Sequence, residues 1–185
     1  DVYKSIRVKK SDISVNLLLP EQYDDYLQNL TKKNRHELSR KKRKFSDQVD
    51  SFELLESCES EIFKIFVSQH KKSKGEKGKF MTENVEAYFE ELFKLDGWKI
   101  YYLNTDKGVV STAFCYENNN GCYLYNSSRD NEFNSLNPGI VLNDLIIQRL
   151  IHNGKSFFDF LKGTERYKFD LGGKSVQLYD LNLIL

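Results

Sequence analysis

The sequence has 185 residues, a length typical of one domain that can bury a full hydrophobic core. Apolar residues make up 39%, aromatic residues 14% and charged residues 30%, and this composition excludes an intrinsically disordered chain. The formal net charge of +1 excludes a chain whose whole surface attracts polyanions.

Neither a membrane-spanning segment nor a secretory leader is visible. No apolar run approaches the roughly 18 residues that a transmembrane helix requires, and no charged start is followed by an apolar stretch. The three cysteines, Cys58, Cys115 and Cys122, lack metal-ligand spacing, so we expect buried thiols, no metal site and a cytoplasmic location. The chain begins at Asp1 and contains one methionine, Met81, so we expect a piece of a longer protein.

The domain boundaries follow from the absence of a linker-like stretch. We interpret residues 1–20 as an N-terminal extension or interdomain segment, in which the apolar residues 15–19 form a strand or a lead-in. Residues 21–185 contain no Ser/Gly-rich run and no internal repeat, so we interpret them as a single domain.

Helices are predicted for most of the first half of this domain. A helix follows Pro20, because Tyr23, Tyr26, Leu27 and Leu30 recur at helical spacing on one face. The next segment, residues 31–45, favours a basic helix, and residues 49–55 alternate like a strand. Helical periodicity returns at residues 61–72 and 83–93, with Thr82 as an N-cap and a basic loop at 71–79 between them.

The hydrophobic period then changes from 3.6 to 2. Three strands are predicted at residues 98–103, 109–117 and 122–128, and their short polar turns indicate an antiparallel meander. After a loop at 129–137, a mostly apolar helix spans 140–152 between this meander and strands at 157–160 and 176–183. This order predicts an α/β fold in which a mixed sheet carries helices on both faces.

Two stretches resemble a known family. Residues 26–41, YLQNLTKKNRHELSRK, are similar to a YLxxLxxKxRxELxRK pattern, and YNSSRD, NPG and NGKSFFDFLKGTERYK follow in order between residues 125 and 168. Together they resemble the FemAB-like, cellulose-biosynthesis-associated acetyltransferases of the GNAT superfamily, from about residue 20 onward. The resemblance implies a GNAT fold and, since family members usually carry two such domains in tandem, a missing N-terminal GNAT-like domain.

The resemblance also implies an activity. Activities in the wider group include acyl transfer from acyl-CoA to an amine and amino-acid transfer from aminoacyl-tRNA to a cell-wall precursor. The common pyrophosphate loop of GNAT domains, Gln/Arg-x-x-Gly-x-Gly/Ala, is replaced here by residues 134–139, NSLNPG. The start of the following helix, formed by Asn137, Pro138, Gly139 and Ile140, is our expected cofactor-binding site, because free N–H groups and the helix dipole suit an anion. The alternative is that Pro138 and Gly139 only begin a helix.

Catalytic residues are expected after the strand at 157–160. Asp159 or Glu165 could accept the proton of an attacking amine, and Tyr167 could protonate the leaving group. Lys168 could bind a phosphate or carboxylate, or it could instead form a structural pair with Asp159.

Two further groups are candidates for binding. Asn126, Ser128, Arg129 and Asp130 end the third meander strand and could bind substrate, or they could form a solvated turn. The segment 32–44 carries eight Lys or Arg residues against one Glu, and we expect a phosphate or polyanion patch or a solvated helix face there. Its central members are Arg35, Arg40, Lys41, Lys42 and Arg43.

The first hypothesis from these observations is an N-acyltransferase that uses acyl-CoA, most simply acetyl-CoA, as its donor. The acceptor would be an amine on a small molecule or on a surface-polysaccharide or cell-wall precursor. The alternatives are an aminoacyl-tRNA-dependent transferase, with tRNA as a partner, and a non-catalytic GNAT-like domain that binds a ligand or a protein.

Overall fold

A computed structural model describes residues 5–184; residues 1–4 of the expected N-terminal extension and residue 185 lie outside it. In chain order the elements are β1 (Ser5–Leu18), α1 (Tyr23–Asn29), α2 (Lys32–Ser46), β2 (Phe52–Ser57), α3 (Ser60–Lys71), α4 (Glu76–Phe80), α5 (Glu83–Phe93), β3 (Trp98–Thr105), β4 (Gly108–Glu117), β5 (Gly121–Arg129), the 3-10 helix η1 (Asn131–Leu136), α6 (Pro138–His152), β6 (Phe157–Lys162), α7 (Arg166–Asp170) and β7 (Lys174–Ile184). None of the helices within residues 5–184 has the length and apolar character that crossing a membrane requires.

The strands form one seven-stranded mixed sheet in the order β2-β3-β4-β5-β6-β1-β7. The predicted meander is confirmed, since β3, β4 and β5 pair antiparallel in sequence. The crossover through α6 makes β5 and β6 parallel. The predicted mixed sheet with helices on both faces is therefore the observed fold.

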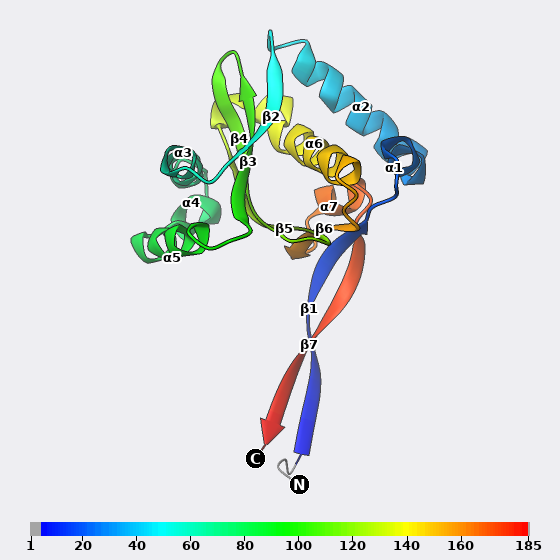
Figure 1. Ribbon diagram of the computed structural model, residues 1–185, viewed down its shortest axis with the longest axis vertical. Helices are drawn as coiled ribbons and strands as arrows, with labels where there is room; N and C mark the ends of the chain where they lie inside the picture. Colours follow the sequence, from blue (N-terminus) through cyan, green and yellow to red (C-terminus); the bar gives the residue numbers. More distant parts are fainter. Residues whose placement is uncertain (1–4, 185) are drawn as a thin grey trace.

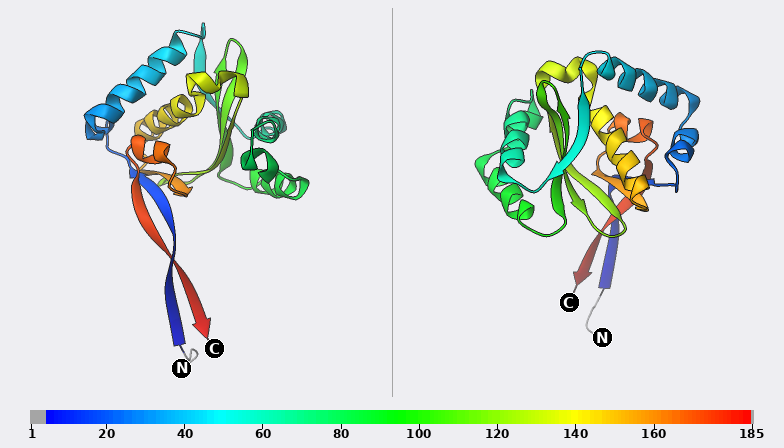
Figure 2. Two further views of the ribbon diagram at one scale, coloured as in Figure 1. Left: turned by 180° about the vertical axis from the view of Figure 1, so that it is seen from behind. Right: turned by 45° about the horizontal axis from the view of Figure 1, so that its top comes forward.

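Helices cover both faces of the sheet, as Figure 1 and the rotated views of Figure 2 show. One face carries α3, α4 and α5, and the other carries α1, α2, α6 and α7. Each face has its own core, one centred on Phe66, Phe89 and Phe114 and the other on α6 residues such as Ile146 and Leu150. Because the central strand β4 is covered on both sides, its residues 110–115 are all buried.

The N-terminal segment is more regular than the sequence predicted. Residues 15–18 belong to the 14-residue strand β1, which lies inside the sheet between β6 and β7. Beyond the helical layers, β1 and β7 continue as a twisted two-stranded ribbon (Figure 1). One face of this ribbon is apolar, because Ile6 pairs with Leu183 and Val8 pairs with Leu181, and all four side chains are exposed.

Three segments that we predicted as loops contain short helices. The basic loop at 71–79 contains the start of α4, the loop at 129–137 contains η1, and the segment between the last two strands contains α7. Each has only five or six residues, too few for helical periodicity to appear in the sequence. Thr82 caps α5 as predicted, since its Oγ1 accepts the Val85 N–H at 3.4 Å.

Candidate functional site

The sheet opens between its two parallel strands. β5 and β6 pair only from Gly121 to Tyr123, although β5 continues to Arg129. On the other side of β5 the register with β4 shifts at the same level, since Asn126 pairs with Phe114 but Leu124 pairs with Cys115. Tyr125 is therefore an extra residue, and such a bulge bends a strand away from its regular path. A gap opens in the middle of the sheet as a result.

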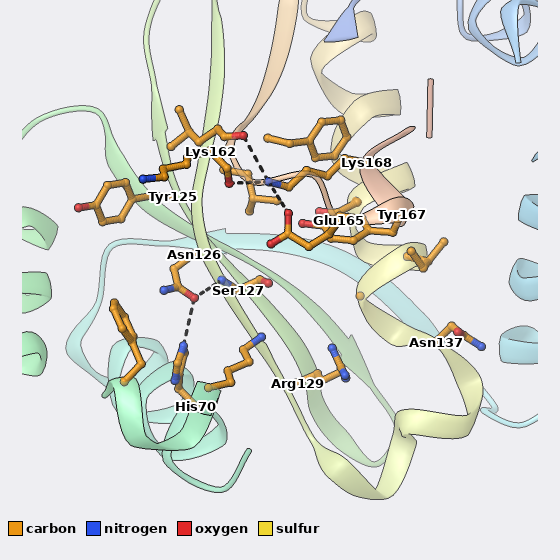
Figure 3. Close-up of a pocket in the computed structure, with 18 of the residues that line it drawn as sticks. His70, Tyr125, Asn126, Ser127, Arg129, Asn137, Lys162, Glu165, Tyr167 and Lys168 are labelled. Atoms are coloured by element: carbon orange, nitrogen blue, oxygen red, sulfur yellow. Dashed lines mark hydrogen bonds and ion pairs between the residues drawn. The ribbon is translucent and has the colours of Figure 1, made fainter. Parts of the chain in front are cut away.

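A cavity of about 800 Å³ occupies this gap (Figure 3). Its volume falls within the range of small-molecule sites. Three groups of elements supply the wall: His70, Lys77 and Phe80 from α3 and α4; Leu124, Tyr125, Asn126, Ser127 and Arg129 from β5; and Asn134, Asn137, Gly139, Ile140, Asn143, Phe160, Leu161, Lys162, Glu165, Tyr167 and Lys168 from η1, α6, β6 and the segment through α7. The cavity thus joins segments from both faces of the sheet.

The start of α6, where we expect a cofactor to bind, borders the cavity. Asn137 adopts a left-handed conformation with φ of 56°, and its carbonyl accepts the N–H groups of Ile140 and Val141. Pro138 has no N–H and is buried behind the cavity wall. The Gly139 N–H donates to no acceptor within residues 5–184. A Cβ atom at Gly139 would meet only Ser111 Oγ, at 3.9 Å, so this position leaves room for a ligand beside the helix end.

Lys168 holds the loop between β6 and α7. Its side chain is 3% exposed, and Nζ donates to the carbonyls of Leu161, Lys162 and Gly163 at 3.3, 2.8 and 3.2 Å. The same ammonium pairs with Glu165 at 2.9 Å. All the donors of Lys168 are therefore engaged within the protein, and its structural partner is Glu165 rather than Asp159.

Tyr167 faces the cavity next to this pair. Burial, and then the negative charge of Glu165, raise the pKa of its hydroxyl to about 12. For Glu165 burial is the largest single influence and opposes ionisation. The hydrogen bonds to its carboxylate, from Lys168 first, and the charges of Lys168 and Lys77 together outweigh burial, so the pKa of that carboxyl lies below its usual value. At neutral pH the cavity therefore contains a protonated phenol, which can donate, and an ionised carboxylate.

A search with protein-family models finds the acetyltransferase (GNAT) domain over residues 32–169, about three quarters of the chain. The chain belongs to this family. No curated protein sequence matches the chain.

Solved structures share the fold of this GNAT domain. FemX matches with a TM-score of 0.70 and 12% identity, over 91% of this chain and 60% of its own. The C-terminal domain of a putative lysylphosphatidylglycerol synthetase from Agrobacterium fabrum matches at 0.64 and 12%, over 96% and 61%. L-PGS from Bacillus licheniformis matches at 0.62 and 13%, over 97% and 62%. The chain spans about three fifths of each, and identities this low establish the FemAB-like GNAT fold alone.

Two cations of the GNAT cavity lack an acidic partner. Burial, and then the positive charge of Arg129, lower the pKa of Lys77 to about 8, while Glu165 acts in the opposite direction. The Arg129 Nε donates to the Asn134 side chain. Within residues 5–184 no carboxylate forms a salt bridge with Lys77 or Arg129. The charges of this wall therefore favour an anionic ligand.

Besides Pro138, three of the expected catalytic and substrate-binding residues lie outside the cavity. The Asp159 carboxylate accepts from Ser14 Oγ at 3.1 Å, Asn16 Nδ2 at 3.2 Å and the Leu161 N–H at 2.7 Å, so it joins β6 to β1. Ser128 is buried, and its hydroxyl contacts the Phe66 carbonyl and Thr112. Asp130 caps η1 by accepting the Glu132 N–H at 3.0 Å. Their observed contacts are structural.

The basic segment divides into structural and exposed residues. Lys42 forms a salt bridge with Asp144, which is completely buried on α6. Arg35 donates to the Leu27 carbonyl, whereas Arg40 and Lys41 both pair with Glu37. A shallow basic depression remains on α2 and α7, and it is lined by Lys33, His36, Glu37, Arg40, Lys41, Arg43, Arg166 and Asp170.

Sequence reasoning missed the wall that α3 and α4 supply. His70 occupies an apolar helix face, and Lys77 is one of five lysines in what we predicted to be a basic loop. Neither position carries a local signal of a site. Only the packing of α3 against β5, which are about 55 residues apart in sequence, brings His70 and Lys77 to the gap in the sheet.

Proposed function

We propose that this GNAT domain transfers an acyl group from a phosphate-bearing thioester donor, acyl-CoA, to a primary amine. The observation that carries the proposal is the cavity at the separation of β5 and β6. It brings together a protonated tyrosine, an ionised carboxylate and two cations without acidic partners. These are the groups that an acyl transfer with an anionic donor requires.

The donor fits the charges of the cavity. Arg129, Lys77 and the Gly139 N–H would hold phosphate groups, because all three are donors and none has a carboxylate partner among the described residues. When bound, acyl-CoA supplies an acyl group activated for attack by nitrogen. The absence of the common pyrophosphate loop is offset here by side-chain cations.

The residues of the chain then have separate tasks. Glu165 is the acidic side chain of the cavity wall, so it attracts the amine acceptor in its ammonium form and accepts a proton from it. As the C–N bond forms and the C–S bond breaks, Tyr167 donates its hydroxyl proton to the departing sulfur and regains a proton from the nitrogen. Its pKa of about 12 keeps the hydroxyl protonated at neutral pH. Asp159 takes no part, because its carboxylate lies outside the cavity.

Calorimetry with acetyl-CoA tests the donor, and turnover with primary amines such as glucosamine tests the reaction. We expect Arg129→Gln to weaken acetyl-CoA binding and Tyr167→Phe to lower kcat by roughly 10²-fold. Tyr179→Phe is the matched control, because Tyr179 is exposed on the ribbon and does not line the cavity. Absence of acetyl-CoA binding at millimolar concentration would rule out this donor, and full turnover of Tyr167→Phe would leave a non-catalytic binding domain as the better hypothesis.

The basic depression on α2 and α7 favours a second candidate, a transferase whose donor is aminoacyl-tRNA. Arg43 and Arg166 are exposed there, and such a surface attracts the RNA backbone. We expect Arg43→Gln and Arg166→Gln to weaken tRNA binding and to reduce its salt dependence, whereas Lys64→Gln, an exposed position on α3, leaves both unchanged. Equal binding by all three variants would remove this candidate.

The setting of the reaction follows from either donor. Both acyl-CoA and aminoacyl-tRNA are cytoplasmic, so we place the reaction in the cytoplasm and the acceptor among surface-polysaccharide or cell-wall precursors. Because the chain spans only about 60% of the FemX chain, we also propose that the full-length protein contains a second GNAT-like domain.

A further inference from the structure

The side chain of Asn126 has a defined orientation at the gap in the sheet. Its Oδ1 accepts the backbone N–H of Ser127 at 2.7 Å. Because a backbone amide can only donate, the side-chain atom at this distance is the oxygen and not the nitrogen. The amide nitrogen, Nδ2, must therefore point the other way.

The orientation of Asn126 in turn determines which ring nitrogen of His70 carries the proton. The same Oδ1 lies 3.1 Å from His70 Nε2, so Nε2 carries a proton and donates it to Asn126 (Figure 3). Burial, and then the charge of Lys77, lower the pKa of His70, so the ring is neutral at pH 7 and Nδ1 is unprotonated. His70 is 1% exposed, and Nδ1 is the buried side-chain polar atom without a hydrogen-bond partner in the described chain. Within residues 5–184 the imidazole therefore has one hydrogen bond, the bond to Asn126.

Nδ2 of Asn126 is left free to meet a ligand. It donates to no residue within 5–184 and is not enclosed by protein, since Asn126 itself lines the cavity. Asn126 directly follows the bulge at Tyr125, beyond the last β5–β6 pair. Figure 3 shows Asn126 on β5 next to His70, and Glu165 and Tyr167 on the segment that runs from β6 through α7; all four residues line the cavity.

We propose that Asn126 Nδ2 donates a hydrogen bond to the carbonyl oxygen of the acyl group being transferred, and that His70 is the positioning residue that holds this donor in place. The inference rests on the proposed acyl transfer. When the amine nitrogen attacks, the carbonyl oxygen gains negative charge, and a donor that is already oriented stabilises that charge without a reorganisation cost. Two accepted hydrogen bonds at Oδ1 prevent the carboxamide from turning, which provides that orientation.

Steady-state kinetics with acetyl-CoA and glucosamine separate this role from ordinary binding. Asn126→Asp retains the shape but removes both donors, and Asn126→Ala removes the group. We expect each variant to lower kcat by roughly 10²–10³-fold with little change in KM, the cost of losing one oxyanion donor. Asn182→Asp, an exposed position on the ribbon, is the matched control. A rise in KM with kcat unchanged would show that Asn126 only binds ligand and would overturn the proposal.

Substitution of His70 tests the positioning role. His70→Phe removes the donor to Asn126 and should lower kcat, whereas His70→Gln retains an N–H donor and should restore most of the loss. Thermal unfolding of both variants monitors folding. If His70→Gln folds but is as impaired as His70→Phe, the hydrogen bond to Asn126 is not what His70 supplies.

The tautomer can be measured without any ligand. We expect ¹⁵N NMR of the imidazole at pH 7 to show a protonated Nε2 and an unprotonated Nδ1 for His70. A proton on Nδ1 would overturn the inference whatever the enzyme does. Failure of the proposed function has a different signature, namely wild-type protein that neither binds acetyl-CoA nor transfers its acyl group.

Discussion

Lys42 provides the sharpest test of the difference between a charged side chain that binds a partner and one that stabilises the fold. It lies within the most basic stretch of the sequence, yet its Nζ contacts Asp144, whose side chain is 0% exposed. The Tyr23 hydroxyl donates to the same carboxylate at 2.8 Å. The cluster joins α1, α2 and α6, and we predict that Lys42→Met destabilises the protein.

The magnitude follows from the exposure of the two partners. Removal of one member of a fully buried ion pair costs about 3–5 kcal/mol, because the remaining charge is buried without compensation. Lys42 is 32% exposed, and water can partly replace it, so we expect a loss of about 2–3 kcal/mol. For a domain of this size that corresponds to a decrease in Tm of roughly 4–12 °C.

Urea and thermal unfolding measure this loss, with Arg43→Met as the control. Arg43 is the next residue, is exposed and forms no salt bridge within the described chain, so its substitution should change stability by less than about 0.5 kcal/mol. In an Asp144→Asn background, Lys42→Met should cost less than half as much, because no buried charge remains. Equal effects of Lys42→Met and Arg43→Met would refute the reasoning.

Three further predictions concern the cavity and the loop beside it. The pKa of Lys77 is about 8, so its positive charge disappears as pH rises. Acetyl-CoA affinity measured by calorimetry should therefore fall between pH 7 and 9. Lys77→Gln should abolish this pH dependence, whereas Lys79→Gln, at an exposed position on the same helix, should retain it. Lys168→Met should cost about 3 kcal/mol in urea unfolding, because it leaves Glu165 and three carbonyls without their donor; a loss below about 1 kcal/mol would contradict the structural role. Gly163→Ala should destabilise by about 1–3 kcal/mol, since Gly163 has a φ of 109°, whereas Gly139→Ala should leave stability nearly unchanged and weaken acetyl-CoA binding.

Much of the fold could be predicted from periodicity. The amphipathic spacing of α5 and the alternation in β3, β4 and β5 are local patterns, and the structure confirms these elements in the predicted order. The long strand β1 could not be predicted in full, because in its outer half only Ile6 and Val8 alternate with polar residues, and both side chains are exposed. Its pairing with β6 and β7 joins residues that are about 140 or more positions apart.

The candidate site was predictable only in part, and for a similar reason. Five of the residues selected from the sequence line the cavity, because they follow strands or begin a helix at the edge where α/β sheets form sites: Asn126, Arg129, Gly139, Glu165 and Tyr167. The binding roles of the first three stay predictions. The catalytic roles assigned to Glu165 and Tyr167 stay predictions. The sequence pattern did not show whether the Asp159 side chain faces the cavity or β1, and in the structure it contacts β1.

The sequence by itself determined the type and order of the longer helices and of the meander strands, and it indicated the family, because hydrophobic periodicity and short motifs are properties of consecutive residues. Tertiary structure alone decided which polar groups are available for chemistry. Lys42 and Lys168 are engaged in internal contacts, whereas Lys77 and His70 reach the cavity. The physical reason is that a side chain's burial and partners depend on strands and helices that pair across the fold, and the separation of β5 from β6 exists only once all of them have assembled.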